Sequence, residues 1–414
     1  MLAPLARRDA LSDTILSYPF AAAVALLGPL AGLAPRGLPV WALTLMALSG
    51  VLLARGGALA RLRPERWTSA AVLAFLALAA ASVAWSPSGR AALTVVEIGY
   101  IALSATLAGA CIADLPEDAA RRLGWLFVGG LLAGILIFSL ENALDHPLHR
   151  WVNGKAADDL SVSEGNVPKR AAALLALLVW PAALVLRRHG QRLLAPALPL
   201  GYAVLSLLQP SRSAIVGIGL GLAVFLAAQR WASATRRALA AALAAAFAGA
   251  IPAAWLFERV LDLDHAPWLF RSAQHRVEIW WRAAGRALET PLLGQGIDAS
   301  RSLKPMGETS QFDPLTENLL PLHPHNAFLQ VWLELGAVGA ALALAVALLV
   351  LAGTARLERD DQPYALASFT AALAMVSTAY GIWQAWWMAG MLAAGLMLVL
   401  ATRVPRNGGR GDGR

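Results

Sequence analysis

Long apolar runs recur from one end of this chain to the other, and they constrain the fold more than any other feature. A run of about 17–25 apolar residues can cross a hydrocarbon core of roughly 30 Å as a single helix. The buried strands of a soluble α/β protein give shorter apolar runs, of about 4–8 residues. We therefore predict an all-α, polytopic membrane protein with about 12 transmembrane helices.

The predicted spans are 15–34, 38–54, 67–85, 92–112, 123–141, 170–186, 193–208, 213–229, 238–257, 327–353, 365–382 and 384–402. Residues 1–257 hold the first nine spans, and residues 258–325 form a long polar loop with amphipathic helices. Residues 326–402 hold the last three spans, and residues 403–414 form a disordered, basic tail that lies on anionic membrane lipids.

The composition agrees with a membrane protein and excludes several other classes. Hydrophobic residues make up 58% of the chain and charged residues 14%, whereas a soluble domain carries about 25% charged residues. The single cysteine, Cys111, rules out a disulfide framework and a thiolate metal site. Arg7 and Arg8 precede the first apolar run without a small-residue cleavage site, so we expect an uncleaved first helix. No P-loop or dinucleotide-binding glycine pattern is present.

The distribution of charge predicts the orientation in the membrane. Twelve spans place both termini on one side, and with the termini inside most of the basic residues fall in the inside loops. Most of the others lie in two long loops, 142–170 and 258–325. Long loops are translocated regardless of charge, whereas short ones follow the positive-inside rule. We therefore expect cytoplasmic termini and two long loops on the outer side, with no nucleic-acid partner despite the net charge of +8.

His325 is the first candidate for chemistry, because it begins an apolar run on the outer side. Histidine is the side chain whose ordinary pKa lets it accept a proton near pH 7. Asn326, Gln330 and Glu334 follow at the spacing of one helix face. A polar stripe that enters a membrane helix is costly and usually faces a cavity. A hydrogen-bonded histidine at a helix start, without a catalytic role, is the alternative.

Two arginines are candidates for binding an anion. Arg212 stands in the sequence Pro210–Ser211–Arg212–Ser213 at the outer start of a span, where backbone N–H groups and a guanidinium can hold a phosphate. The stretch from Arg271 to Glu289 predicts an amphipathic helix suited to the membrane interface. Arg276 departs from its polar face and lies beside Trp280, so we expect an anionic partner there. That partner is expected to be a lipid-linked phosphate, while contact with lipid headgroups alone is the alternative for Arg212.

The remaining outer basic residues could contribute to substrate binding, and metal sites are weak candidates. Lys169, Arg170, Arg90 and His323 complete the expected substrate-binding set with Arg212, Arg276 and Asn326. Asp262–Leu263–Asp264 is similar to the acidic pairs that hold a divalent metal for sugar transfer, and four histidines (His265, His275, His323 and His325) could form a zinc site. Since no established metal-ligand spacing is present, we expect no metal and no cofactor.

These motifs together resemble a known family. His325–Asn326 is followed after nine residues by Gly336 and after two more by Gly339, a pattern similar to the signature of bacterial O-antigen ligases. Ser211–Arg212–Ser213–Ala214, Arg276 with Ile279–Trp280, and the turn from Pro291 to Gly296 resemble other landmarks of the wider O-antigen ligase and polymerase superfamily. The resemblance covers about residues 200–340.

The resemblance implies an enzyme at the periplasmic face of the bacterial inner membrane. Such an enzyme moves a polysaccharide from undecaprenyl diphosphate onto a sugar of lipid A–core, with His325 as its essential histidine and Arg212 and Arg276 as its essential arginines. We expect His325 to act as general base in a single, inverting displacement without a metal. The alternatives are an O-antigen polymerase or a protein O-oligosaccharyltransferase of the same superfamily, then a transporter of lipid-linked sugars.

Overall fold

The computed structural model describes residues 10–59, 62, 64–156, 166–208, 211–303 and 322–406. Within these residues the protein is all-α and carries no strand, as a polytopic membrane protein should. The helices are α1 Ala10–Leu33, α2 Leu38–Arg55, α3 Arg66–Ser82, α4 Ala91–Ala113, α5 Glu117–Ala143, α6 Pro147–Asn153, α8 Asn166–Arg188, α9 Leu194–Ser206, α10 Arg212–Trp255, α11 Arg271–Glu289, α12 Ala327–Gly353, α13 Gln362–Val376 and α14 Ala385–Arg403.

Each predicted span coincides with a helix or with part of one. Among the described residues, seven helices are long and apolar enough to cross a membrane by themselves, and shorter apolar helices include 18–33, 66–82 and 194–206. The eighth and ninth predicted spans form one element, α10, which bends at Trp231 (φ −135°, ψ 50°). The second half of α10 runs back to the end of the bundle where the first half begins. Accordingly, the guanidinium of Arg212, at the start of α10, lies 3.9 Å from the ring of Phe270, which follows its end.

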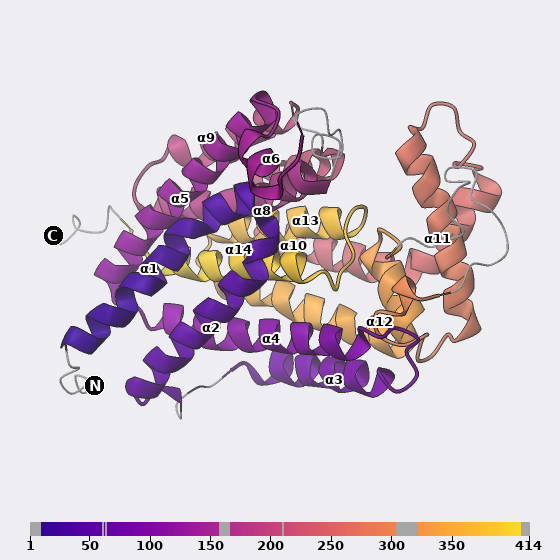
Figure 1. Ribbon diagram of the computed structural model, residues 1–414, viewed down its shortest axis with the longest axis horizontal. Helices are drawn as coiled ribbons and strands as arrows, with labels where there is room; N and C mark the ends of the chain where they lie inside the picture. The colour runs from indigo at the N-terminus through magenta and orange to yellow at the C-terminus, as the bar shows by residue number, and fades with distance from the viewer. Residues whose placement is uncertain are drawn as a thin grey trace.

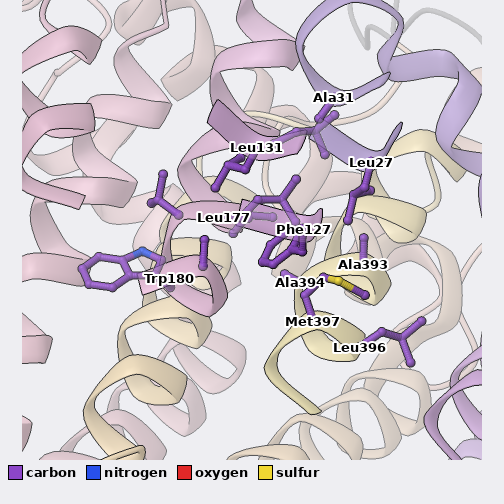
Figure 2. Close-up of a cluster of buried hydrophobic side chains, with 14 of the residues drawn as sticks. Leu27, Ala31, Phe127, Leu131, Leu177, Trp180, Ala393, Ala394, Leu396 and Met397 are labelled. Atoms are coloured by element: carbon purple, nitrogen blue, oxygen red, sulfur yellow. The ribbon is translucent and has the colours of Figure 1, made fainter. Parts of the chain in front are cut away.

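α8 forms the centre of the bundle. Its residues from Ala171 to Val185 are buried almost without exception, as expected of a helix that touches protein and not lipid on every side. Figure 2 shows part of this core, where Leu177 and Trp180 of α8 lie beside Phe127 and Leu131 of α5, Leu27 of α1 and Met397 of α14. Ala393 and Ala394 keep α14 close to this cluster, since small residues let helices approach closely within a membrane.

The loops that we expected inside meet at one end of the bundle. The buried Arg188 at the end of α8 pairs with Asp361, and its Nη2 donates to Glu358 at 3.1 Å. Arg406, beyond α14, pairs with the same Glu358 at 2.8 Å. In Figure 1, α1 begins and α14 ends at this end, while α11 stands at the other. Order therefore continues beyond Arg403 as far as Arg406, and the rest of the expected tail, 407–414, lies outside the described residues.

The predicted amphipathic helix is confirmed with its bounds, Arg271–Glu289 as α11. Its charged residues Glu278 and Arg282 are largely buried and form an ion pair at 2.9 Å. Ala283 and Ala287 pack against Leu333 of α12, whereas Leu288 is exposed. α11 therefore packs against the start of α12 on one side and pairs its own charges on another, so it is part of the folded protein and not only of the interface.

Candidate active site

Five segments meet at the end of the bundle where α11 lies: the starts of α8, α10 and α12, the middle of α11, and the link between α13 and α14. Tyr380, in that link, joins the starts of α8 and α10. Its hydroxyl donates to the Lys169 carbonyl at 2.8 Å and also hydrogen-bonds Ser211 and Ser213 at the start of α10. Its ring packs edge-on against Trp386 at 4.8 Å. Tyr380 was not among our candidates, since nothing in the sequence marks one tyrosine at the end of an apolar run.

His325 is held in one orientation and one tautomer. Its backbone is in the left-handed region, with φ 55°, and its Nδ1 lies 2.5 Å from the carbonyl oxygen of Ala379. Because a carbonyl can only accept, Nδ1 must carry the proton and donate it. In a neutral imidazole the other nitrogen, Nε2, is then the basic one. The arrangement leaves Nε2 as the atom that can take a proton from a substrate.

The surroundings of His325 keep it neutral. Burial lowers the pKa of the His325 imidazole to about 4, and the positive charges of Arg276 and His275 act in the same direction. The hydrogen bond to Ala379 opposes these effects. At neutral pH the ring is therefore uncharged, and it is available as a base without first losing a proton.

His323 supports His325. It is buried, and its Nδ1 accepts the backbone N–H of His325 at 3.2 Å. The two rings pack edge to face with centroids 4.3 Å apart, and burial lowers the pKa of His323 to about 3. The ring also lies against Gly381, where a Cβ atom would meet it at 2.8 Å. This arrangement gives the predicted substrate-binding residue a part in positioning His325.

Arg276 reaches the same region from α11. Trp280, one turn later, donates its indole N–H to the carbonyl of Pro324 at 2.9 Å, which ties α11 to the segment that carries His325. Burial lowers the pKa of the Arg276 guanidinium, the charge of Arg212 lowers it further, and Tyr380 opposes both. Arg276 keeps its charge, since the ordinary pKa of arginine is above 12, and a bound anion would stabilise that charge.

Arg212 is the first residue of α10, next to its cap. The Ser211 hydroxyl accepts the backbone N–H of Ala214 at 3.4 Å, and the Arg212 guanidinium lies over the Phe270 ring at 3.9 Å. Stacking on an aromatic face holds the guanidinium plane while leaving its N–H edge available for a phosphate. Arg276 thus lies within electrostatic range of Arg212 on one side and of His325 on the other.

The other predicted binding residues have different positions. Asn326 caps α12, because its side-chain oxygen accepts the N–H groups of Phe328 and Leu329 at 3.0 and 3.2 Å. The guanidinium of Arg170 lies 5.7 Å from the Trp386 ring, beside Tyr380. Arg90 starts α4 and lies 3.8 Å from Glu97, and its charge is not among those that act on His325.

The polar stripe of α12 does not face a cavity, so that interpretation is wrong. Gln330 and Glu334 are buried, and the carboxyl group of Glu334 accepts four hydrogen bonds. Its donors are the Asp298 N–H at 2.6 Å, the Ser300 hydroxyl at 2.6 Å, the Trp383 indole at 2.7 Å and the Gln330 amide at 3.1 Å. The stripe therefore binds two neighbouring segments to the start of α12.

α12 is interrupted at Gly336, with φ 62° and ψ −162°. A Cβ atom on Gly336 would lie 2.4 Å from the backbone of Leu292, and one on Gly294 would lie 2.3 Å from the backbone of Glu334. The turn from Pro291 to Gly296 enters the break: the Gln295 and Gly296 N–H groups donate to the carbonyls of Leu333 and Glu334 at 2.9 and 2.8 Å. Only glycine permits this close approach in a left-handed conformation.

The sequence is also similar to known proteins. Residues 198–344 match the family model described as O-Antigen ligase. Over these residues the chain is similar to the O-antigen ligase family. A protein named as a polysaccharide ligase in Rickettsia conorii is 30% identical over 63% of this chain and 62% of its own length. Similarly named proteins of Rickettsia prowazekii and Rickettsia bellii are 28% and 29% identical, over 63% and 68% of each chain. The chain thus spans less than two thirds of the first two relatives.

The O-antigen ligase match divides the candidates into two groups. Arg212, Arg276, His325 and Gly336 lie within it, as do Asn326 and His323. Arg90, Lys169 and Arg170 lie before it. The matched region therefore contains the candidates on α10, α11 and the start of α12, while Tyr380, which hydrogen-bonds the Lys169 carbonyl, follows it.

Metal-ligating side chains gather elsewhere. Among the described residues, one group of three brings its ligand atoms within 4.8 Å of one another: Asp262, Asp264 and His265. This group lies on the turn before α11, where Asp262 and His265 are exposed and already hydrogen-bonded to each other at 2.9 Å. Within the described residues, His275, His323 and His325 do not belong to a group of this kind. The site around His325 therefore offers cationic side chains, not a cluster of metal ligands.

Proposed function

We propose that the protein transfers a polysaccharide from undecaprenyl diphosphate to a sugar hydroxyl of lipid A–core at the periplasmic face of the inner membrane. The match of residues 198–344 to the O-antigen ligase family model supports the class of reaction, and the polysaccharide-ligase names of the rickettsial relatives agree with it. The gathering of the expected inside loops at the end of the bundle opposite α11 supports this orientation. The observation that carries the proposal is the neutral His325, with Nε2 as its basic atom, beside Arg276.

The proposed mechanism is a single displacement. The acceptor hydroxyl oxygen attacks the anomeric carbon of the donor and forms the new glycosidic bond, while His325 Nε2 takes the hydroxyl proton. The bond from the anomeric carbon to the diphosphate oxygen breaks, and the diphosphate leaves with the electron pair. Arg276 and Arg212 stabilise the charge that develops there, since preorganised cations in a water-poor site are worth several kcal/mol in a transition state. Attack opposite the leaving group inverts the configuration.

The decisive experiment supplies the purified, reconstituted protein with an undecaprenyl-diphosphate glycan and lipid A–core, with and without a chelator. We expect glycosylated lipid A–core in both cases, with inverted configuration at the anomeric carbon. A second lipid-linked glycan in place of lipid A–core tests the polymerase, and a peptide acceptor tests the oligosaccharyltransferase. Product formed only with the second lipid-linked glycan or only with the peptide contradicts the ligase. Loss of product in the presence of chelator contradicts the metal-free mechanism. Uptake of the donor without any product favours a transporter.

The pH dependence of kcat/KM provides a separate test. Only the neutral imidazole can accept a proton, and burial holds the pKa of His325 at about 4. We therefore expect kcat/KM to stay level as the pH falls from 7 to about 5 and to reach half its value near the lowered pKa. An acidic midpoint near 6.5, the usual histidine value, would show that the base is an unperturbed group and not this buried ring.

The substitution Arg276→Lys tests the guanidinium. Lysine keeps the charge but loses the planar fork that matches a phosphate. We expect kcat to fall by roughly tenfold, less than the roughly 100-fold or greater loss on removing a preorganised donor entirely. Arg271→Lys, on the exposed first turn of the same helix, is the matched control and should leave kcat unchanged. Unchanged kcat in Arg276→Lys would mean that charge alone is sufficient there.

A further inference from the structure

A second cationic site lies at the bend of α10, at the end of the bundle away from His325. A cavity of about 560 Å³ opens there between α10 and the turn that joins α12 to α13. Its lining includes Arg230, Arg236 and Arg237 of α10 and Arg359 of the turn, together with Trp231 and Gln362. Four guanidinium groups from two elements therefore surround one hollow.

The bend itself builds this cavity. Because Trp231 is not helical, Arg230 before it and Arg237 after it approach the hollow from the two halves of α10. Gln362 closes another side: its amide nitrogen donates to the Leu357 carbonyl at 2.9 Å, and its oxygen accepts from Arg236 at 3.2 Å. Arg236 thus links α10 to α13 through Gln362. The other three arginines of the lining, Arg230, Arg237 and Arg359, can bind a ligand.

Among the residues that the structure describes, these arginines have no protein counter-charge in the cavity. No carboxylate lines the cavity, and within the described ranges no ion pair involves Arg230, Arg237 or Arg359. The nearest acidic residues along the chain, Glu358 and Asp360, pair with Arg406 at 2.8 and 3.5 Å. Like charges brought together repel each other, so an anion in this cavity would be bound favourably.

We propose that this cavity binds the phosphate headgroup of an anionic phospholipid from the leaflet at that end. The first half of α10, residues 212–230, is about 28 Å long at 1.5 Å per residue, which is close to the thickness of the hydrocarbon core. The bend therefore lies at headgroup depth. Trp231 is 63% exposed there, as expected for a tryptophan at the membrane interface. Arginine forks match phosphodiester oxygens, and three of them suit a headgroup with two phosphates.

The test uses native mass spectrometry of the full-length protein in detergent with defined lipids. Diphosphatidylglycerol is titrated against phosphatidylcholine, and inorganic phosphate and glycerol phosphate are added as soluble competitors. The variant Arg230→Gln/Arg237→Gln/Arg359→Gln removes three charges from the cavity and leaves Arg236 and its bond to Gln362 intact. The matched control, Arg55→Gln/Arg121→Gln/Arg122→Gln, removes three charges from other loops expected on the same side.

We expect diphosphatidylglycerol to bind at least tenfold more tightly than phosphatidylcholine, with at least a tenfold loss in the cavity variant and less than twofold in the control. Equal losses in both variants would mean diffuse attraction to the leaflet, and displacement of the lipid by inorganic phosphate at equal concentration would mean a soluble ligand; either overturns the proposal. Arg359→Gln alone, on an exposed turn, tests the site if the triple variant does not fold. A threefold loss supports the site, and unchanged binding overturns it. The proposal does not depend on the transfer reaction.

Discussion

Replacing His325 by alanine should lower the rate of polysaccharide transfer by about 10²–10⁴-fold, the range attributed to a positioned general base. The loss should fall on kcat, because the proton moves only in the transition state. Folding should persist, since among the described residues the ring donates a hydrogen bond to the Ala379 carbonyl and packs edge-on against His323. The measurement is single-turnover transfer to lipid A–core, with thermal unfolding recorded on the same sample.

His265→Ala is the matched control, because His265 is an exposed histidine on the turn before α11. It should retain full activity. Near-wild-type transfer by the purified His325→Ala variant would show that His325 is not the general base. A large loss of thermal stability together with the loss of transfer would instead indicate that His325 has a structural part.

Glu334→Ala should lower the free energy of unfolding by about 4 kcal/mol or more. The carboxyl group accepts from Asp298, Ser300 and Trp383, all three hydrogen bonds being buried. Each buried donor left without an acceptor costs about 1–3 kcal/mol. Transfer should fail as well, because the same group holds Trp383 and the segment from Asp298 in place. Chemical denaturation of the reconstituted protein measures the stability.

Two further variants show whether the hydrogen bonds are the cause. Glu334→Gln keeps the size and one acceptor oxygen, so we expect a smaller loss, about half of that in Glu334→Ala. Glu289→Ala, at the exposed end of α11, removes a carboxylate whose ion pair with Arg286 is at the surface, and surface pairs contribute about 1 kcal/mol or less. If all three variants unfold alike, the buried network is not the source of the stability.

Much of this fold could be predicted from the sequence because membrane helices have a strong signal. Apolar runs long enough to cross a bilayer give each helix nearly on its own. α11 was predictable with its bounds, since its alternation of charged and apolar residues has the helical period. The bend at Trp231 was not predictable, because arginines after a run of apolar residues indicate a loop equally well.

The candidate site was predictable only in part. His325, Arg212 and Arg276 carry chemistry that is rare beside a membrane, so the sequence draws attention to them. Tyr380 does not stand out, and its position became evident only when the starts of α8 and α10 met at its hydroxyl. The role of Glu334 was misread for a similar reason: a carboxyl group on a membrane helix indicates a cavity until its donors, 34 and 36 residues earlier, are known.

The interruption at Gly336 separates two mechanical functions within α12. Residues after the glycine follow the thickness and tilt of the bilayer, as any spanning helix must. The nine residues before it are fastened to the turn at Pro291, to α11 and to Trp383. When the surrounding bilayer becomes thinner or thicker, the residues of α12 after Gly336 should therefore change their tilt, and the residues before it should not move. The distance between His325 and the cationic groups should then stay constant in membranes of different lipid composition.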